Sequence, residues 1–159
     1  MSRCIGIFVL AAVGMIVGCQ PAQRLESVED AATVEEAVEA EFAVDIEAAE
    51  QMVVKDIIGG VDDRYKAGFI ARDKFYGDFS KMMLDLLPES SRIRSQEINV
   101  QHKRIVALAV DAALVTASGD YVATTTSGET FGGDFNWTFV YVKIGEKWKV
   151  IHSHQSGSD

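Results

Sequence analysis

The sequence predicts one α+β domain in which helices come first and cover one face of an antiparallel sheet. Two observations predict this fold class. Apolar residues recur at helical spacing in the first half of the chain, and from Arg92 onward they alternate with polar ones in segments rich in Val, Ile, Thr and aromatic residues. The 159 residues leave room for one domain and a short tail. Acidic residues outnumber basic ones by 24 to 15 and no Lys- or Arg-rich stretch occurs, which argues against nucleic-acid binding.

The N-terminal segment has the features of an export signal. Arg3 is followed by the uncharged residues 5–17, a stretch shorter than the roughly 20 residues that a membrane-crossing helix needs. The residues at its end, Ile16-Val17-Gly18-Cys19, resemble the bacterial lipobox. We therefore expect a lipoprotein signal peptide over residues 1–18 and lipidation of Cys19. The alternative is an ordinary signal peptide in which Cys19 is incidental.

Lipidation would also determine the cellular location of the protein. Acyl chains on Cys19 would hold it on a lipid bilayer of the bacterial cell envelope, with the domain facing the periplasm or the exterior. Gln20 stands where some lipoproteins of the inner membrane carry Asp, so delivery to the outer membrane stays open. The other cysteine, Cys4, lies in the segment to be removed, and we therefore expect no disulfide and no Cys-based metal site in the domain.

An acidic segment leads into the first expected helix. Ten acidic residues and no basic one lie between Leu25 and Val54. Within this segment apolar residues recur at steps of three or four, at Val34, Val38, Phe42, Ile46, Ala49, Val53 and Ile57. This stripe predicts an amphipathic helix over residues 34–58, ended by Gly59-Gly60, after an acidic tether over residues 19–33. The acidic side chains would then form the solvated face of the helix rather than a metal site.

Changes of period and turn residues predict the later elements. Residues 61–71 should form a loop or a short helix, and residues 72–87 a second helix that Pro88 ends. After it we expect four strands, at residues 92–108, 112–126, 130–144 and 147–155.

The last hairpin predicts which side chains share a face. If Gly145-Glu146 forms the tip, Tyr141 pairs with Val150, Phe139 with His152 and Trp137 with His154. Directly opposed residues lie on the same side of a sheet, so we expect one surface to carry the predicted ligand-pocket residues Trp137, Phe139, Tyr141, His152 and His154.

The same hairpin carries a family resemblance. Trp137-Thr138-Phe139-Val140-Tyr141-Val142-Lys143 and Trp148-Lys149-Val150-Ile151-His152-Ser153-His154-Gln155-Ser156-Gly157 look like the closing hairpin of SnoaL-like domains, which belong to the nuclear-transport-factor-2-like superfamily. The second segment is also similar to the last strand of the association domain of calcium/calmodulin-dependent protein kinase. The resemblance covers residues 92–157 and assigns residues 34–157 to the domain.

This resemblance implies a fold and an assembly. It implies a cone, in which a long helix and shorter ones pack on a curved antiparallel sheet around a pocket at the open end. It also implies a homodimer formed through the sheet. The chain departs from the family where a Trp or an Asp-rich segment usually follows the first helix. Neither is recognisable in residues 59–73, so the resemblance does not define the pocket rim that this segment contributes.

Three functions stay open from the sequence. The first is an envelope lipoprotein that binds a small hydrophobic ligand or a protein partner without catalysis. The second is a SnoaL-like isomerase or hydrolase in which His152 or His154 acts as general base. The third is a structural dimerisation module. A histidine pair could bind a metal, but only Glu97 and Asp120 suggest themselves as a third ligand, and we expect neither a metal nor a cofactor. The favoured interpretation of either histidine is a structural, hydrogen-bonded ring, because cross-strand packing with the aromatic residues already explains its position.

Overall fold

The computed structural model describes residues 25–158, so the expected signal peptide, Cys19 and the first part of the tether lie outside the described residues. Helices precede the long strands, as predicted. The elements in chain order are α1 (Val28–Glu50), α2 (Val54–Gly59), the 3-10 helix η1 (Asp63–Tyr65), β1 (Phe69–Ala71), β2 (Lys74–Tyr76), α3 (Phe79–Ser90), β3 (Ile93–Ala109), β4 (Ala112–Thr125), β5 (Thr130–Ile144) and β6 (Lys147–Ser158). No helix within residues 25–158 is long and apolar enough to cross a membrane.

Helix α1 confirms the predicted apolar stripe but has different ends. Val34, Val38 and Phe42 are buried. The helix begins at Val28 because the Ser27 side chain accepts a hydrogen bond from the Asp30 N–H at 3.1 Å, so residues 28–33 are helical where we expected tether. It ends at Glu50, and the left-handed Met52, with φ of 54°, turns the chain into the separate helix α2.

The expected second helix over residues 72–87 is wrong in its first half. Residues 69–76 form a short hairpin of β1 and β2, and Arg72 takes φ of 58° in its turn. Strand β1 pairs in parallel with β6, a partner that lies far away in the sequence. Helix α3 then runs through Pro88 instead of ending before it, and the hydroxyls of Ser90 and Ser91 donate to carbonyls of its last turn.

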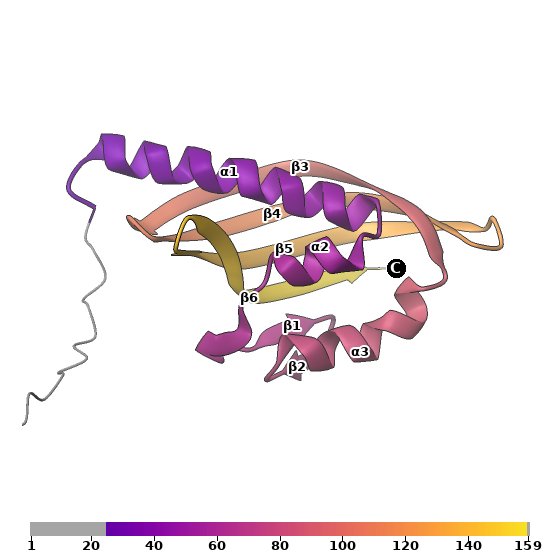
Figure 1. Ribbon diagram of the computed structural model, residues 1–159. Helices are drawn as coiled ribbons and strands as arrows, with labels where there is room; N and C mark the ends of the chain where they lie inside the picture. Colours follow the sequence, from indigo (N-terminus) through magenta and orange to yellow (C-terminus); the bar gives the residue numbers. More distant parts are fainter. Residues whose placement is uncertain (1–24, 159) are drawn as a thin grey trace, which may run out of the picture.

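The six strands form one mixed sheet in the order β2-β1-β6-β5-β4-β3. Only the β1–β6 pair is parallel, and the four long strands lie close to where the sequence predicts them. Figure 1 shows α1 running along β3 and β4, α3 beside the β1–β2 hairpin, and α2 between them. We call the side that α1 covers, which carries Val115 and Tyr141, the helix face, and the side that carries Thr116 and Val140 the outer face.

The register of the last hairpin differs from the prediction beyond its first rungs. Tyr141 pairs with Val150 as expected, but Ile151 is an extra residue, a β-bulge, and Val140 pairs with His152. As a result Phe139 opposes Ser153, and Thr138 opposes His154. A shift of one residue moves every later side chain of the strand to the other side of the sheet. His152 and His154 therefore lie on the outer face, opposite to the face that we predicted.

Candidate functional site

The aromatic half of the predicted pocket lies on the helix face. The Phe139 ring is 6.0 Å from that of Phe42 in α1, and the rings of Phe135 and Trp137 stack at 3.9 Å. Tyr141 is buried in the core, against which Trp137 and Phe139 also pack. The three aromatic residues of the predicted pocket are therefore brought together, but they pack against the core and leave the histidines on the other side of the sheet.

The two histidines have separate surroundings. His152 is half-buried and its Nδ1 lies 2.7 Å from the carbonyl oxygen of Gly68, next to β1. His154 is exposed on the outer face, beside Thr138. Within residues 25–158 no three His, Cys, Asp or Glu side chains come close enough to hold a metal ion. Glu97 and Asp120, the suggested third ligands, therefore do not complete a metal site with the histidines.

A half-buried acid that the sequence analysis missed, Asp45, lies on the side of α1 that faces the sheet. The hydroxyl of Tyr141 donates to Oδ2 of Asp45 in α1 at 2.6 Å. Burial raises the pKa of Asp45 to about 6, Glu41 also raises it, and the bond from Tyr141 and the nearby Lys149 lower it. Burial likewise raises the pKa of Tyr141 well above its ordinary value. One signal was in the sequence, because Asp45 lies three residues after Phe42 and so on the apolar side of the helix.

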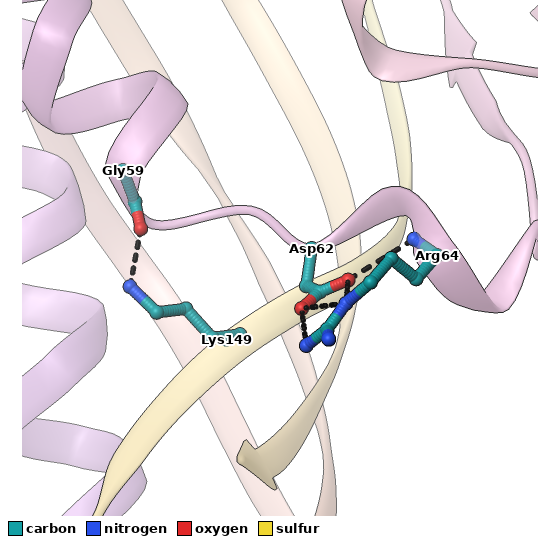
Figure 2. Close-up of polar contacts among 4 residues, drawn as sticks. All are labelled: Gly59, Asp62, Arg64 and Lys149. Atoms are coloured by element: carbon teal, nitrogen blue, oxygen red, sulfur yellow. Dashed lines mark hydrogen bonds and ion pairs between the residues drawn. The ribbon is translucent and has the colours of Figure 1, made fainter. Parts of the chain in front are cut away.

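The segment after α2 holds this helix against β6. The N–H of Asp62 donates to the Val150 carbonyl and the N–H of Val150 donates to the Gly60 carbonyl, each at 2.9 Å. Figure 2 shows the Lys149 ammonium donating to the carbonyl of Gly59, the last residue of α2, and Asp62 paired with Arg64. A cation at the last carbonyls of a helix is favourable, so Lys149 fixes the end of α2.

Gly60 closes this segment over Asp45. A Cβ at Gly60 would come within 2.7 Å of Asp45 Oδ1, so a side chain at this position would force the carboxylate to move. Asp45 and Tyr141 are thus packed beneath the α2 segment.

An apolar hollow lies between α2 and α3. Its volume is about 430 Å³, and it is lined mainly by Val54, Ile58, Val61, Phe79, Met83, Leu84 and Leu87. Asp63 and Ser80 are its polar residues. Three of the apolar side chains are notably exposed: Ile58 by 50%, Leu84 by 71% and Leu87 by 41%. Neither Asp45 nor Tyr141 nor either candidate histidine lines this hollow. The arrangement can accept an apolar group, and it offers few polar contacts to orient one.

Comparison with known proteins places these features in a family. Residues 76–159, more than half of the chain, match the family described as the calcium/calmodulin dependent protein kinase II association domain. No curated protein sequence matches the chain significantly.

Solved structures share the fold at low sequence identity. A protein from Streptomyces avermitilis, provisionally assigned as a dehydratase of the nuclear-transport-factor-2-like family, superposes with a TM-score of 0.68 at 14% identity, covering 80% of this chain and 99% of that one. A type 2 hexachlorocyclohexane dehydrochlorinase gives 0.66 at 11% identity, with 84% and 90% covered. A Xanthomonas campestris protein, provisionally assigned as a calcium/calmodulin dependent protein kinase II association domain, gives 0.65 at 15%, with 76% and 85% covered. The predicted nuclear-transport-factor-2-like fold is therefore confirmed.

Proposed function

We propose a function for this chain, which belongs to the calcium/calmodulin dependent protein kinase II association domain family. In this proposal it is a lipid-anchored protein of the cell envelope, and it binds a small hydrophobic ligand without catalysis. The observation that carries the proposal is the apolar hollow between α2 and α3. Its volume of about 430 Å³ falls within the range of small-molecule pockets. Exposed apolar side chains gathered at such a hollow mark a binding surface more often than isolated ones do.

Catalysis is left out of the proposal because, within residues 25–158, no pair of acid–base groups lines the hollow. His152 and His154 lie on the outer face, away from the aromatic residues that would have formed a substrate pocket with them. Asp45 and Tyr141 are covered by the α2 segment and do not line the hollow. The carboxylate of Asp63 is the strongest polar group there, and it suits the orientation of a ligand rather than a proton transfer, which needs a positioned partner.

A neutral fluorescent probe, N-phenyl-1-naphthylamine, tests the hollow directly. The wild-type protein should bind it with increased fluorescence, and Leu84→Gln should weaken binding about fivefold to tenfold because an amide replaces apolar surface in the hollow. The control is Val44→Gln, which changes an exposed apolar residue of α1 outside the hollow and should leave binding unchanged. Equal binding by all three proteins would contradict the proposal.

The family favours self-association as a second function. The matched family is described as an association domain, and a homodimer through the outer face of the sheet would suit that description. The half-buried side chains of Leu114, Val140 and Val142 supply apolar contact area on this face. Sedimentation velocity should then show a dimer that Leu114→Glu dissociates, whereas a wild-type monomer at tens of micromolar would contradict this candidate.

A further inference from the structure

We propose that the outer face of the sheet carries a second site, which binds an anionic saccharide such as a sugar acid or a sugar phosphate. An open hollow of about 480 Å³ lies on this face and crosses β3, β4, β5 and β6. The site does not depend on the apolar hollow proposed above, because its functional side chains lie on the opposite side of the sheet from the helices and none of them lines that hollow. It shares the outer face with the self-association given as the second function, so a dimer that buries this face would exclude it.

The register aligns polar side chains across the four strands in two neighbouring rows. The first row runs from Arg104 through Thr116 and Thr138 to His154. The second runs from His102 through Ser118 and Asn136 to Ser156. Two β-bulges, one in β3 and one in β6, produce this alignment. Gln101 in β3 and Ile151 in β6 are the extra residues that put the histidines on the outer face with the hydroxyl groups.

The charge of the hollow is opposite to that of the molecule. The chain carries a net charge of −9, yet no carboxylate lines this hollow, and Arg104 lies in it together with His102 and His154. Within residues 25–158 the Arg104 guanidinium has no ion pair and no hydrogen bond. It is exposed and its donors are therefore available to a ligand.

Two acids, Asp120 and Asp134, oppose each other in the next row of this face, and neutral donors hold Asp120. Asp120 lies one row beyond Ser118, and its Oδ2 accepts hydrogen bonds from Asn99 at 3.1 Å and from Gln101 at 2.5 Å. The negative charges of Asp120 and Asp134 oppose an anion at the second row. The anionic group of the ligand is therefore expected at Arg104, in the row farther from Asp120.

The chemistry of the two rows selects the ligand class. A guanidinium offers paired donors that match a carboxylate or a phosphate. The hydroxyls of Thr116, Ser118 and Thr138 and the amide of Asn136 both donate and accept hydrogen bonds, as the hydroxyl groups of a sugar require. Four strands spaced at about 4.8 Å span about 14 Å, which exceeds a bare oxyanion and suits one or two sugar rings. Hence a charged sugar fits better than an inorganic ion.

Isothermal titration calorimetry on the purified full chain tests the site with four probes: glucuronate, glucose 6-phosphate, glucose and inorganic phosphate. We expect the two charged sugars to bind at least tenfold more tightly than glucose or phosphate. Arg104→Gln should weaken both by tenfold or more, and Thr138→Val should weaken them while leaving the oxyanion contact in place. Asp120→Asn should strengthen them, because it removes the opposing charge.

The matched control is Arg94→Gln, which removes the same charge from an exposed position of β3 outside the hollow and should leave binding unchanged. Phosphate binding as tight as that of glucose 6-phosphate would overturn the saccharide assignment. An equal loss in Arg94→Gln and Arg104→Gln would reduce the effect to overall charge and overturn the site. A dimer that buries this face and binds none of the four probes would overturn it as well. None of these results bears on N-phenyl-1-naphthylamine binding between α2 and α3.

Discussion

At the scale of single residues, Asp45 is the acid whose protonation is most closely tied to the fold. Its pKa rises from the ordinary 3.8 to about 6, chiefly because burial disfavours its charged form. The folded protein therefore holds the Asp45 proton more tightly than the unfolded chain does between these two values. The contribution of Asp45 to stability must therefore fall as the pH rises through this window and then level off above it.

Asp45→Asn should remove this pH dependence. The raised pKa corresponds to at most about 3 kcal/mol of stability that is lost between about pH 4 and pH 6. Asparagine stays neutral and its oxygen can still accept the hydrogen bond of Tyr141. We therefore expect the variant to be more stable than the wild type at pH 7 and about equal to it at pH 4, measured by urea unfolding.

Tyr141→Phe provides the matched test of the same pair. It removes the hydroxyl that donates to Asp45, so the buried carboxylate loses its donor. The free energy of unfolding should drop by about 1–3 kcal/mol at pH 7 and by less at pH 4. A loss of the same size at both values would show that the carboxylate does not depend on this bond.

The two histidines should differ in reactivity because their surroundings on the outer face differ. His154 is exposed, whereas His152 is half-buried with its Nδ1 beside the Gly68 carbonyl. Diethylpyrocarbonate, followed by mass spectrometry of the peptides, should modify His154 clearly faster than His152, with exposed His102 as the internal reference. Faster reaction at His152 would contradict this register and favour the one predicted from the hairpin tip.

At the scale of elements, α1 protects the open edge of the sheet. Strand β3 has no strand neighbour on one side, and carboxylates of α1 bind its free backbone groups: Glu50 accepts from the N–H of Ile98 at 2.8 Å and Glu35 from that of Ala107 at 3.2 Å. Unpaired edge groups invite pairing with other chains. From the sequence we expected the acidic side chains of this helix only to form its solvated face. Two of them, Glu35 and Glu50, also bind backbone N–H groups of the sheet edge.

Glu50→Ala should expose this role. Loss of the acceptor for the Ile98 N–H should cost about 1–3 kcal/mol in the free energy of unfolding, because the bond involves a charged group. Glu50→Gln should cost less, since the amide oxygen can still accept. Glu36→Ala, at an exposed position of the same helix, serves as the control and should stay within about 0.5 kcal/mol. If all three variants unfolded alike in urea, the edge contact would contribute nothing.

How well each element could be predicted followed from its length and its contacts. The α1 stripe and the four long strands repeat their period over many residues, and both were found from the sequence. The strands β1 and β2 have three residues each, too few for a period to show, and β1 is fixed by pairing with β6 far along the chain. The bulge at Ile151 has no residue signal of its own, so a register counted from the hairpin tip failed beyond it.

At the scale of the molecule, the bulge at Ile151 separates the predicted pocket residues onto the two faces of the sheet. The predicted pocket combined aromatic and histidine residues of one hairpin, but these two groups lie on opposite faces of the sheet. The aromatic residues complete the core under α1, and the outer face receives the polar side chains. Two surfaces of different chemistry result, an apolar hollow between the helices and a polar one on the sheet. Sequence patterns could not reveal the first, because α2 and α3 meet only through the tertiary fold.

The expected lipid anchor on Cys19 would determine where those surfaces lie in the cell. If Cys19 is acylated, bacteria grown with an alkyne analogue of palmitate should label the wild-type protein and retain it in the membrane fraction. Cys19→Ser should lose the label and release the domain, because the 13 uncharged residues 5–17 are too few to hold it by spanning the bilayer. Cys4→Ser should be labelled like the wild type, since Cys4 lies within the segment expected to be removed. Labelling that persists in Cys19→Ser would refute lipidation at Cys19. The two proposed binding sites, between α2 and α3 and on the outer face, would be unaffected, but the membrane localisation would lose its support.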